Sequence, residues 1–278
     1  MTGSEADLTR GTTPSGGLGR LDRLGLADRV DRLDRLDALR GLAVVWMAGF
    51  HFSFDLNLWG LWHPRQDFYH DPFWTVQRTL IVSLFMLCAG MGQAVAHEAG
   101  VGWGRFWRRW AQVAACALLV SAGSAWMFPH SWISFGVLHG MAVMWILLRL
   151  TARWRLPWVW VGTLLIVAPQ VLQHPWFDSR WTSWVGLVTH KPITEDYVPV
   201  LPWLGVMGWG WALGQWGLKQ APGSRFDVLR GAVTPLGRPL AILGRWSLTF
   251  YMVHQPVILG VLMAGLHWGW WSGGTMSR

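Results

Sequence analysis

Residues 36–56 read LDALRGLAVVWMAGFHFSFDL, an apolar stretch long enough to cross a bilayer as one helix. A spanning helix needs about 20 mostly apolar residues, and other stretches of the chain meet the same criterion. We therefore predict an all-α fold, a polytopic transmembrane helix bundle of about seven spans. The predicted spans are residues 38–61, 74–97, 106–128, 131–150, 156–173, 198–218 and 245–267.

The composition agrees with lipid as the solvent for most of the chain. Hydrophobic residues make up 52% of the 278 residues and charged residues only 14%, which is more apolar than an ordinary soluble domain. The 24 Trp residues often flank apolar runs, as expected at the boundary between membrane and water. The net charge of +8 lies between apolar runs and not in one patch, so we predict no nucleic-acid partner.

The Arg and Lys residues predict the orientation. They are frequent before residue 36, at 105–109, at 149–155 and at 219–238, and sparse in the segments between these. Positive residues accumulate on the cytoplasmic side of a membrane. We therefore predict a multi-pass protein of the cytoplasmic (inner) membrane, with its N-terminus inside and its C-terminus outside.

We expect three regions along the chain. Residues 1–36 are predicted to be a cytoplasmic tail, and apolar residues at helical spacing within 20–36 predict an amphipathic helix on the membrane surface. Residues 37–268 are predicted to form the transmembrane domain, and residues 269–278 a short outer tail.

Ionisable side chains inside the predicted spans are the first candidates for a functional site, because burying them in a membrane is costly. His51 and Asp55 are four residues apart in the first span and share one helix face. A carboxylate one turn from an imidazole can orient it as a general base. The alternative is a hydrogen-bonded pair that holds helices together.

Further polar residues fall at compatible depths and predict a shared polar cavity. His70 ends the loop WHPRQDFYHDPFW (62–74), with Asp67 and Asp71 beside it, and Arg78 follows in the next span. His139, His254 and Gln255 lie in later spans. Metal-ligand spacings such as HxxxH are absent, so we predict no metal site.

Five ordered segments resemble one known family. They are LDALRGLAVVWMAGFHFSFDL, LFMLCAGM at 84–91, ISFGVLHGMAV at 133–143, DYVPVLPWLGV at 196–206 and LGRWSLTFYMVHQPVI at 243–258. These segments look like bacterial members of the heparan-alpha-glucosaminide N-acetyltransferase catalytic-domain family. The resemblance implies transfer of an acetyl group from acetyl-CoA, on the cytoplasmic side, to a sugar amine on the other side. Arg40 and His51, with ten residues between them, also resemble a pattern in membrane O-acyltransferases of surface polysaccharides.

The two resemblances imply different catalytic histidines. His70 matches the family's histidine ahead of the second helix, whereas His51 matches the O-acyltransferase pattern. We predict that Asp55 or Asp71 orients the imidazole. Donor or substrate binding is predicted for Asp37, Arg40, Arg78, His139, His254 and Gln255.

The same polar residues also fit a non-enzymatic membrane transporter that carries protons or a solute. The acceptor, the acyl group and any assembly of several copies are not determined by the sequence. We expect the lipid bilayer and a sugar or glycan acceptor as partners.

Overall fold

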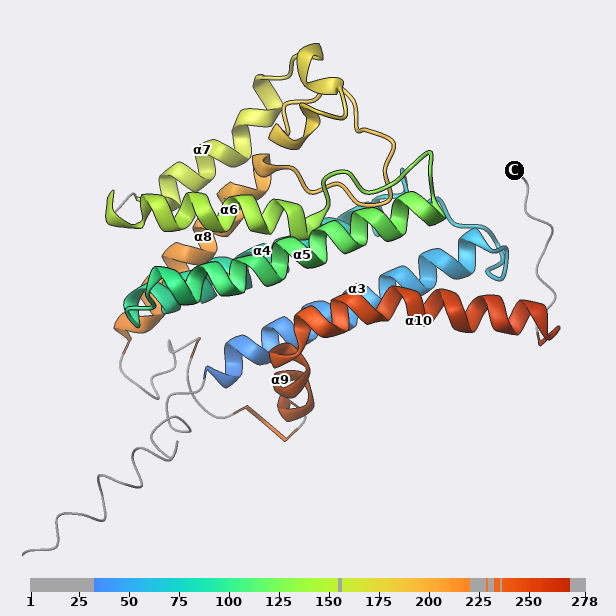
Figure 1. Ribbon diagram of the computed structural model, residues 1–278, viewed down its shortest axis with the longest axis horizontal. Helices are drawn as coiled ribbons and strands as arrows, with labels where there is room; N and C mark the ends of the chain where they lie inside the picture. The colour runs from blue at the N-terminus through green and yellow to red at the C-terminus, as the bar shows by residue number, and fades with distance from the viewer. Residues whose placement is uncertain (1–32, 155–156, 221–228, 230–232, 236, 271–278) are drawn as a thin grey trace, which may run out of the picture. The chain divides into compact units, whose positions relative to one another are not determined.

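The computed structural model describes residues 33–154, 157–220, 229, 233–235 and 237–270 (Figure 1). Over these residues the chain is α-helical, and the β-contact found there is an isolated bridge between Phe135 and Tyr197. The predicted all-α class is confirmed. The helices are α3 (Asp34–Leu58), α4 (Pro72–Glu98), α5 (Trp103–Met127), α6 (Val137–Thr151), α7 (Trp158–Val171), α8 (Val200–Lys219), α9 (Gly237–Arg245) and α10 (Ser247–His267), with the short 3-10 helices η2 (Ala152–Trp154), η3 (Pro175–Asp178) and η4 (Ser183–Val185).

The chain divides into two units, Met1–Leu33 and Asp34–Arg278. The predicted amphipathic helix within 20–36 lies almost entirely outside the described residues. All helices named above belong to the second unit.

Three of the described helices, α4, α5 and α10, are long and apolar enough to cross a membrane. Helices α6 and α7 are apolar but shorter. Each of the seven predicted spans coincides with a helix, so the helical stretches themselves were predicted well. Seven membrane crossings and an N-in orientation stay predictions.

Helix α6 begins at Val137, six residues later than the predicted start of the fourth span at residue 131. The backbone ahead of it is hydrogen-bonded to a side chain of α5, because the Ile133 N–H donates to Ser124 Oγ at 3.0 Å. Gly136 has no side chain to cap the helix, and the Asp196 carboxylate accepts the Val137 N–H at 2.7 Å instead. An added Cβ at Gly136 would overlap that carboxylate. The start of α6 is therefore set by a contact between segments far apart in sequence.

Helix α8 packs between α4 and α7 through its glycines. A Cβ at Gly210 would overlap the backbone of Leu87 in α4, and a Cβ at Gly205 would overlap the carbonyl oxygen of Gly162 in α7. Small residues let helix backbones approach closely in apolar surroundings, where dispersion contacts drive association. The glycine-rich sequence of α8 thus allows it to contact one helix on each side.

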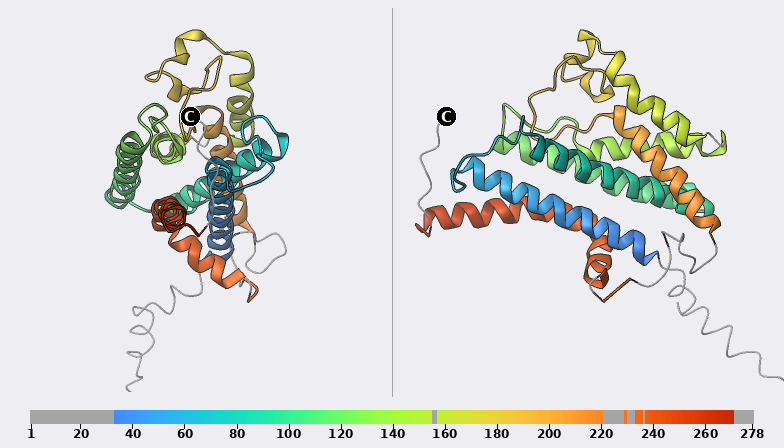
Figure 2. Two further views of the ribbon diagram at one scale, coloured as in Figure 1. Left: turned by 90° about the vertical axis from the view of Figure 1, so that its right-hand side faces the viewer. Right: turned by 180° about the vertical axis from the view of Figure 1, so that it is seen from behind.

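Helix α3 contacts α4, α9 and α10. The backbones of α3 and α9 come together where a Cβ at Gly41 would overlap the Leu240 carbonyl. The right view of Figure 2 shows α10 lengthwise beside α3, with α9 turned at an angle to both helices. Because α10 lies beside α3, the polar residues of both helices can meet.

We expect Gly210→Ala to lower the free energy of unfolding by about 1–3 kcal/mol, because a methyl group there must push α8 away from the α4 backbone. Titration of the detergent-solubilised protein with a denaturing detergent measures this change. Gly123→Ala in α5 is the control, since a Cβ there meets nothing within 4 Å. Alanine is the better helix former by about 1 kcal/mol, so the control should be neutral or stabilising. Equal effects of the two substitutions would contradict the packing interpretation.

Candidate functional site

Polar side chains of α3 and α10 meet in what we call the α3–α10 polar cluster, formed by His51, Asp55, His254 and Gln255. The His51 and His254 rings lie 5.3 Å apart between centroids, with 56° between their planes. One turn further along α3, Gln255 Nε2 donates to Asp55 Oδ2 at 2.8 Å. Asp55 is only 2% exposed. The structure thus pairs His51 with His254, and Asp55 with Gln255 instead of with His51.

Two atoms of this cluster are buried and have no hydrogen-bond partner among the described residues, His254 Nε2 and Gln255 Oε1. His254 is 9% exposed, and its Nδ1 lies 2.7 Å from the Tyr251 carbonyl oxygen. Buried polar atoms are nearly always paired with protein or water. Unpaired ones therefore point to water or another group that binds there.

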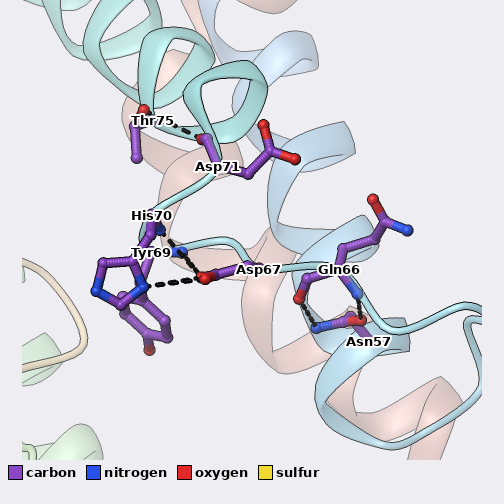
Figure 3. A network of polar contacts seen from close by, with 7 residues as sticks. All are labelled: Asn57, Gln66, Asp67, Tyr69, His70, Asp71 and Thr75. Atoms are coloured by element: carbon purple, nitrogen blue, oxygen red, sulfur yellow. Dashed lines mark hydrogen bonds and ion pairs between the residues drawn. The ribbon is translucent and has the colours of Figure 1, made fainter.

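A second imidazole site lies in the loop between α3 and α4 (Figure 3). His70 Nδ1 donates to the Asp67 carboxylate, at 3.0 Å from Oδ2. The His70 side chain is 86% exposed. Asp71, the predicted orienter, points away from His70 and caps α4, accepting the Phe73 N–H at 2.8 Å. The orienting carboxylate of His70 is thus Asp67, which forms the arrangement of an oriented general base.

A pocket of about 400 Å³ opens beside this loop, at the same end of α3. Asn57 fixes one wall of it, because its side chain exchanges two hydrogen bonds with the Gln66 backbone, at 2.9 and 2.7 Å. The pocket is lined by Phe54, Asn57, Leu58, Arg65, Gln66, Asp67, Phe68 and Tyr69.

The segment before α8 contains Lys191 and Glu195, and it places charged side chains near the loop that holds His70. Lys191 Nζ lies 5.9 Å from the centroid of the Tyr69 ring. Partial burial raises the pKa of Tyr69 above its usual value of 10.0, Glu195 raises it further, and Arg78 lowers it. Glu195 also interacts electrostatically with Asp55. This segment therefore adds charged side chains near the loop site, and our sequence analysis missed it.

The Arg40 end of α3 carries a separate ion-pair network. Arg40 Nη1 lies 2.9 Å from Asp37 Oδ1, and Arg245 of α9 contacts Asp34 at 2.7 Å and Asp37 at 3.6 Å. Arg40 also lies against α4, because a Cβ on Gly92 would overlap its guanidinium. These contacts hold α3, α4 and α9 together at the end opposite the histidines.

His139 lies in the contact between α5 and α6. Its Nδ1 accepts the Gly136 N–H at 3.3 Å, so Nε2 carries the proton and donates to Ser121 Oγ at 3.2 Å. The Ser121 hydroxyl in turn donates to the Ile133 carbonyl at 2.6 Å. Both ring nitrogens are used by the protein itself, which gives His139 a role in holding these helices.

The structure thus brings together two of the four predicted cavity histidines, His51 and His254. His70 faces the surface with Asp67, and His139 is bonded within α5 and α6. The Asp67 contact could have been found from sequence, since an aspartate side chain often accepts N–H groups two and three residues later. The segment containing Lys191 and Glu195 gave no such local signal. Among the described residues, no three His, Cys, Asp or Glu side chains gather to hold a metal ion.

Residues 32–256 match the family described as heparan-alpha-glucosaminide N-acetyltransferase, catalytic. The chain belongs to this family. The match covers most of the chain, including both imidazole sites and the Arg40 end of α3. Membership in the heparan-alpha-glucosaminide N-acetyltransferase family indicates a membrane acetyltransferase. No curated protein and no solved structure matches the chain.

We expect the turn that holds His70 to loosen in acid. Hydrogen bonds from the backbone N–H groups of His70 and Tyr69 lower the pKa of Asp67 below its usual value of 3.8. A lowered pKa means that the turn is stabilised at pH values above 3.8 and that this stabilisation is lost as the pH falls through the lowered pKa. The protection factors of the Tyr69 and His70 amides, which are their hydrogen-exchange rates corrected for the intrinsic pH dependence of exchange, measure the effect as a function of pH.

Asp67→Asn should abolish this pH dependence. Thr189 is the control within the same molecule, because Asp178 accepts its N–H at 2.7 Å and the pKa of Asp178 is lowered as well, chiefly by the Thr189 hydroxyl. Its amide should keep its pH response in Asp67→Asn. An unchanged response of the His70 amide in that variant would refute the role of Asp67.

Proposed function

We propose that this protein transfers the acetyl group of acetyl-CoA to an amine or hydroxyl group of an envelope sugar. Family membership supports the acetyl donor, because enzymes of this type use acetyl-CoA. We retain the predicted three regions and seven spans in the inner membrane. With the predicted N-in orientation, the Arg40 end of α3 faces the cytoplasm, and the loop between α3 and α4 lies outside. In this arrangement the donor arrives at the Arg40 end and the acceptor at the loop end.

The observation that carries the proposal is the meeting of His51 and His254 beside Asp55 in the buried contact of α3 and α10. Burying ionisable groups at such a place costs free energy, so their presence there points to a function. Acetyl transfer needs a base that takes a proton from the acceptor, and an imidazole is well suited to that task at neutral pH. Arg40 lies 11 residues before His51, about 16 Å along the helix axis. One helix thus carries both a cation for the donor and an imidazole for the chemistry.

The sugar acceptor is supported by the pocket at the loop end. Its lining combines the aromatic rings of Phe54 and Tyr69 with the polar groups of Asn57 and Gln66, a combination that favours binding of a ring bearing hydroxyl groups. Arg78 and Lys191 lie near Tyr69 and supply positive charge at the same end. Arg78 is a candidate to stabilise the negative charge that develops on the carbonyl oxygen during transfer.

The exposed His70 and Asp67 form a second candidate base. It agrees with the family resemblance, whereas His51 agrees with the resemblance to membrane O-acyltransferases. Burial favours the α3–α10 polar cluster, because charge stabilisation is stronger where water is excluded. The two candidates are separated by experiment.

We expect the full chain, purified in detergent, to transfer labelled acetyl from acetyl-CoA to glucosamine. His51→Ala should lower kcat by about 10²–10⁴-fold, which is the usual contribution of a general base and of the residues that orient it. His70→Ala should have the smaller effect. A larger loss in His70→Ala would move the chemistry to the exposed dyad.

His139→Ala is the control, because its ring contributes hydrogen bonds to α5 and α6 and lies outside the cluster. It should change stability more than turnover per folded molecule. Solute flux into proteoliposomes without consumption of the thioester would instead identify a carrier.

A further inference from the structure

The two unpaired atoms of the α3–α10 polar cluster are both hydrogen-bond acceptors. Gln255 must direct its NH₂ group at Asp55, because its carbonyl oxygen would be repelled by the carboxylate. The remaining Gln255 oxygen, Oε1, is buried and has no partner among the described residues. An amide oxygen can only accept. This position therefore calls for a donor from outside the protein.

The tautomer of His254 leads to the same conclusion. A carbonyl oxygen can only accept, so the 2.7 Å contact with the Tyr251 carbonyl places the proton of a neutral ring on Nδ1. Nε2 then carries the lone pair, and it is buried without a partner among the described residues. His254 thus holds a fixed, available base atom.

Both acceptors belong to side chains that contact α3. His254 contacts the ring of His51 and Gln255 contacts the carboxylate of Asp55, and these two α3 residues are one helical turn apart. Burying acceptors without donors destabilises a fold. The interface is therefore complete only when a group with donor hydrogens occupies it.

We propose that the nucleophile of the acceptor binds at this interface, that His254 Nε2 removes its proton, and that Asp55 and Gln255 are positioning residues. This inference rests on the proposed acetyl transfer and assigns the base within it. Either an amine or a hydroxyl acceptor carries a hydrogen that Nε2 can accept.

The reaction step balances with the groups named. The amine nitrogen attacks the carbonyl carbon of the thioester, and the new C–N bond forms as the C–S bond breaks. The nitrogen gives its proton to His254 Nε2, and the electron pair of the C–S bond leaves on sulfur. The resulting thiolate takes that proton from the imidazolium and leaves as the free thiol. The Tyr251 carbonyl accepts the Nδ1–H throughout and stabilises the charged ring.

His51 acts through His254 in this scheme. Its ring lies against the His254 ring at 5.3 Å and restricts the orientation of Nε2. A loss of activity in His51→Ala is therefore expected even though His254 moves the proton. This explains how His51 can be required without being the base.

The test compares wild type, His254→Gln and the control His97→Gln, in the last turn of α4, as full chains in detergent with labelled acetyl-CoA and glucosamine. Glutamine can fill the site and form hydrogen bonds but cannot act as a base. We expect His254→Gln to lose about 10²–10⁴-fold in kcat, with KM for acetyl-CoA unchanged within about twofold. His97→Gln should keep most of the turnover per folded molecule.

A second variant separates a base from a structural role. In His254→Ala, added imidazoles should restore transfer, and the restored rate should increase with the basicity of the imidazole at similar size. Rescue that is independent of basicity, or a His254→Gln kcat close to wild type, would overturn the assignment. Wild-type protein that transfers no acetyl group would instead refute the proposed function.

Discussion

A carboxylate buried among apolar helices needs hydrogen-bond donors, and the Gln255 amide supplies one to Asp55. In surroundings of low polarity the loss of that donor would raise the cost of burying the carboxyl group. The pairing fixes α10 against α3 at one register. Because His254 precedes Gln255, the same register places the two imidazoles side by side.

The opposite end of α3 is held by different forces. There Asp34 and Asp37 bind Arg245 of α9, and Gly41 allows the two backbones to come into contact. One helix is thus anchored by ion pairs at one end and by buried hydrogen bonds at the other. A frame of this kind would keep the proposed donor site and the proposed site of proton transfer at a constant separation along a rigid element.

The two imidazole sites have opposite environments. His70 is exposed and its carboxylate partner Asp67 belongs to the same turn, so the dyad can form without the helix bundle. His254 is buried and takes its orientation from a backbone carbonyl of α10. An exposed dyad is screened by water, whereas a buried imidazole interacts strongly with any polar group that enters. This contrast explains why we assign the proton transfer to the buried histidine.

The sequence by itself determined the helical segments, because the length and hydropathy of an apolar stretch are local properties. It also identified His51, Asp55, His254 and Gln255 as residues of interest, since polar groups in apolar stretches stand out. It predicted a shared cavity for four histidines, however, and an orienting role for Asp55 or Asp71. In the structure, His139 is hydrogen-bonded to Ser121 and Gly136, and Asp71 caps α4. Only the tertiary structure decided which polar groups are partners, because the contact between Asp55 and Gln255 joins residues 200 positions apart, and no local pattern encodes how helices so distant in the chain pack together.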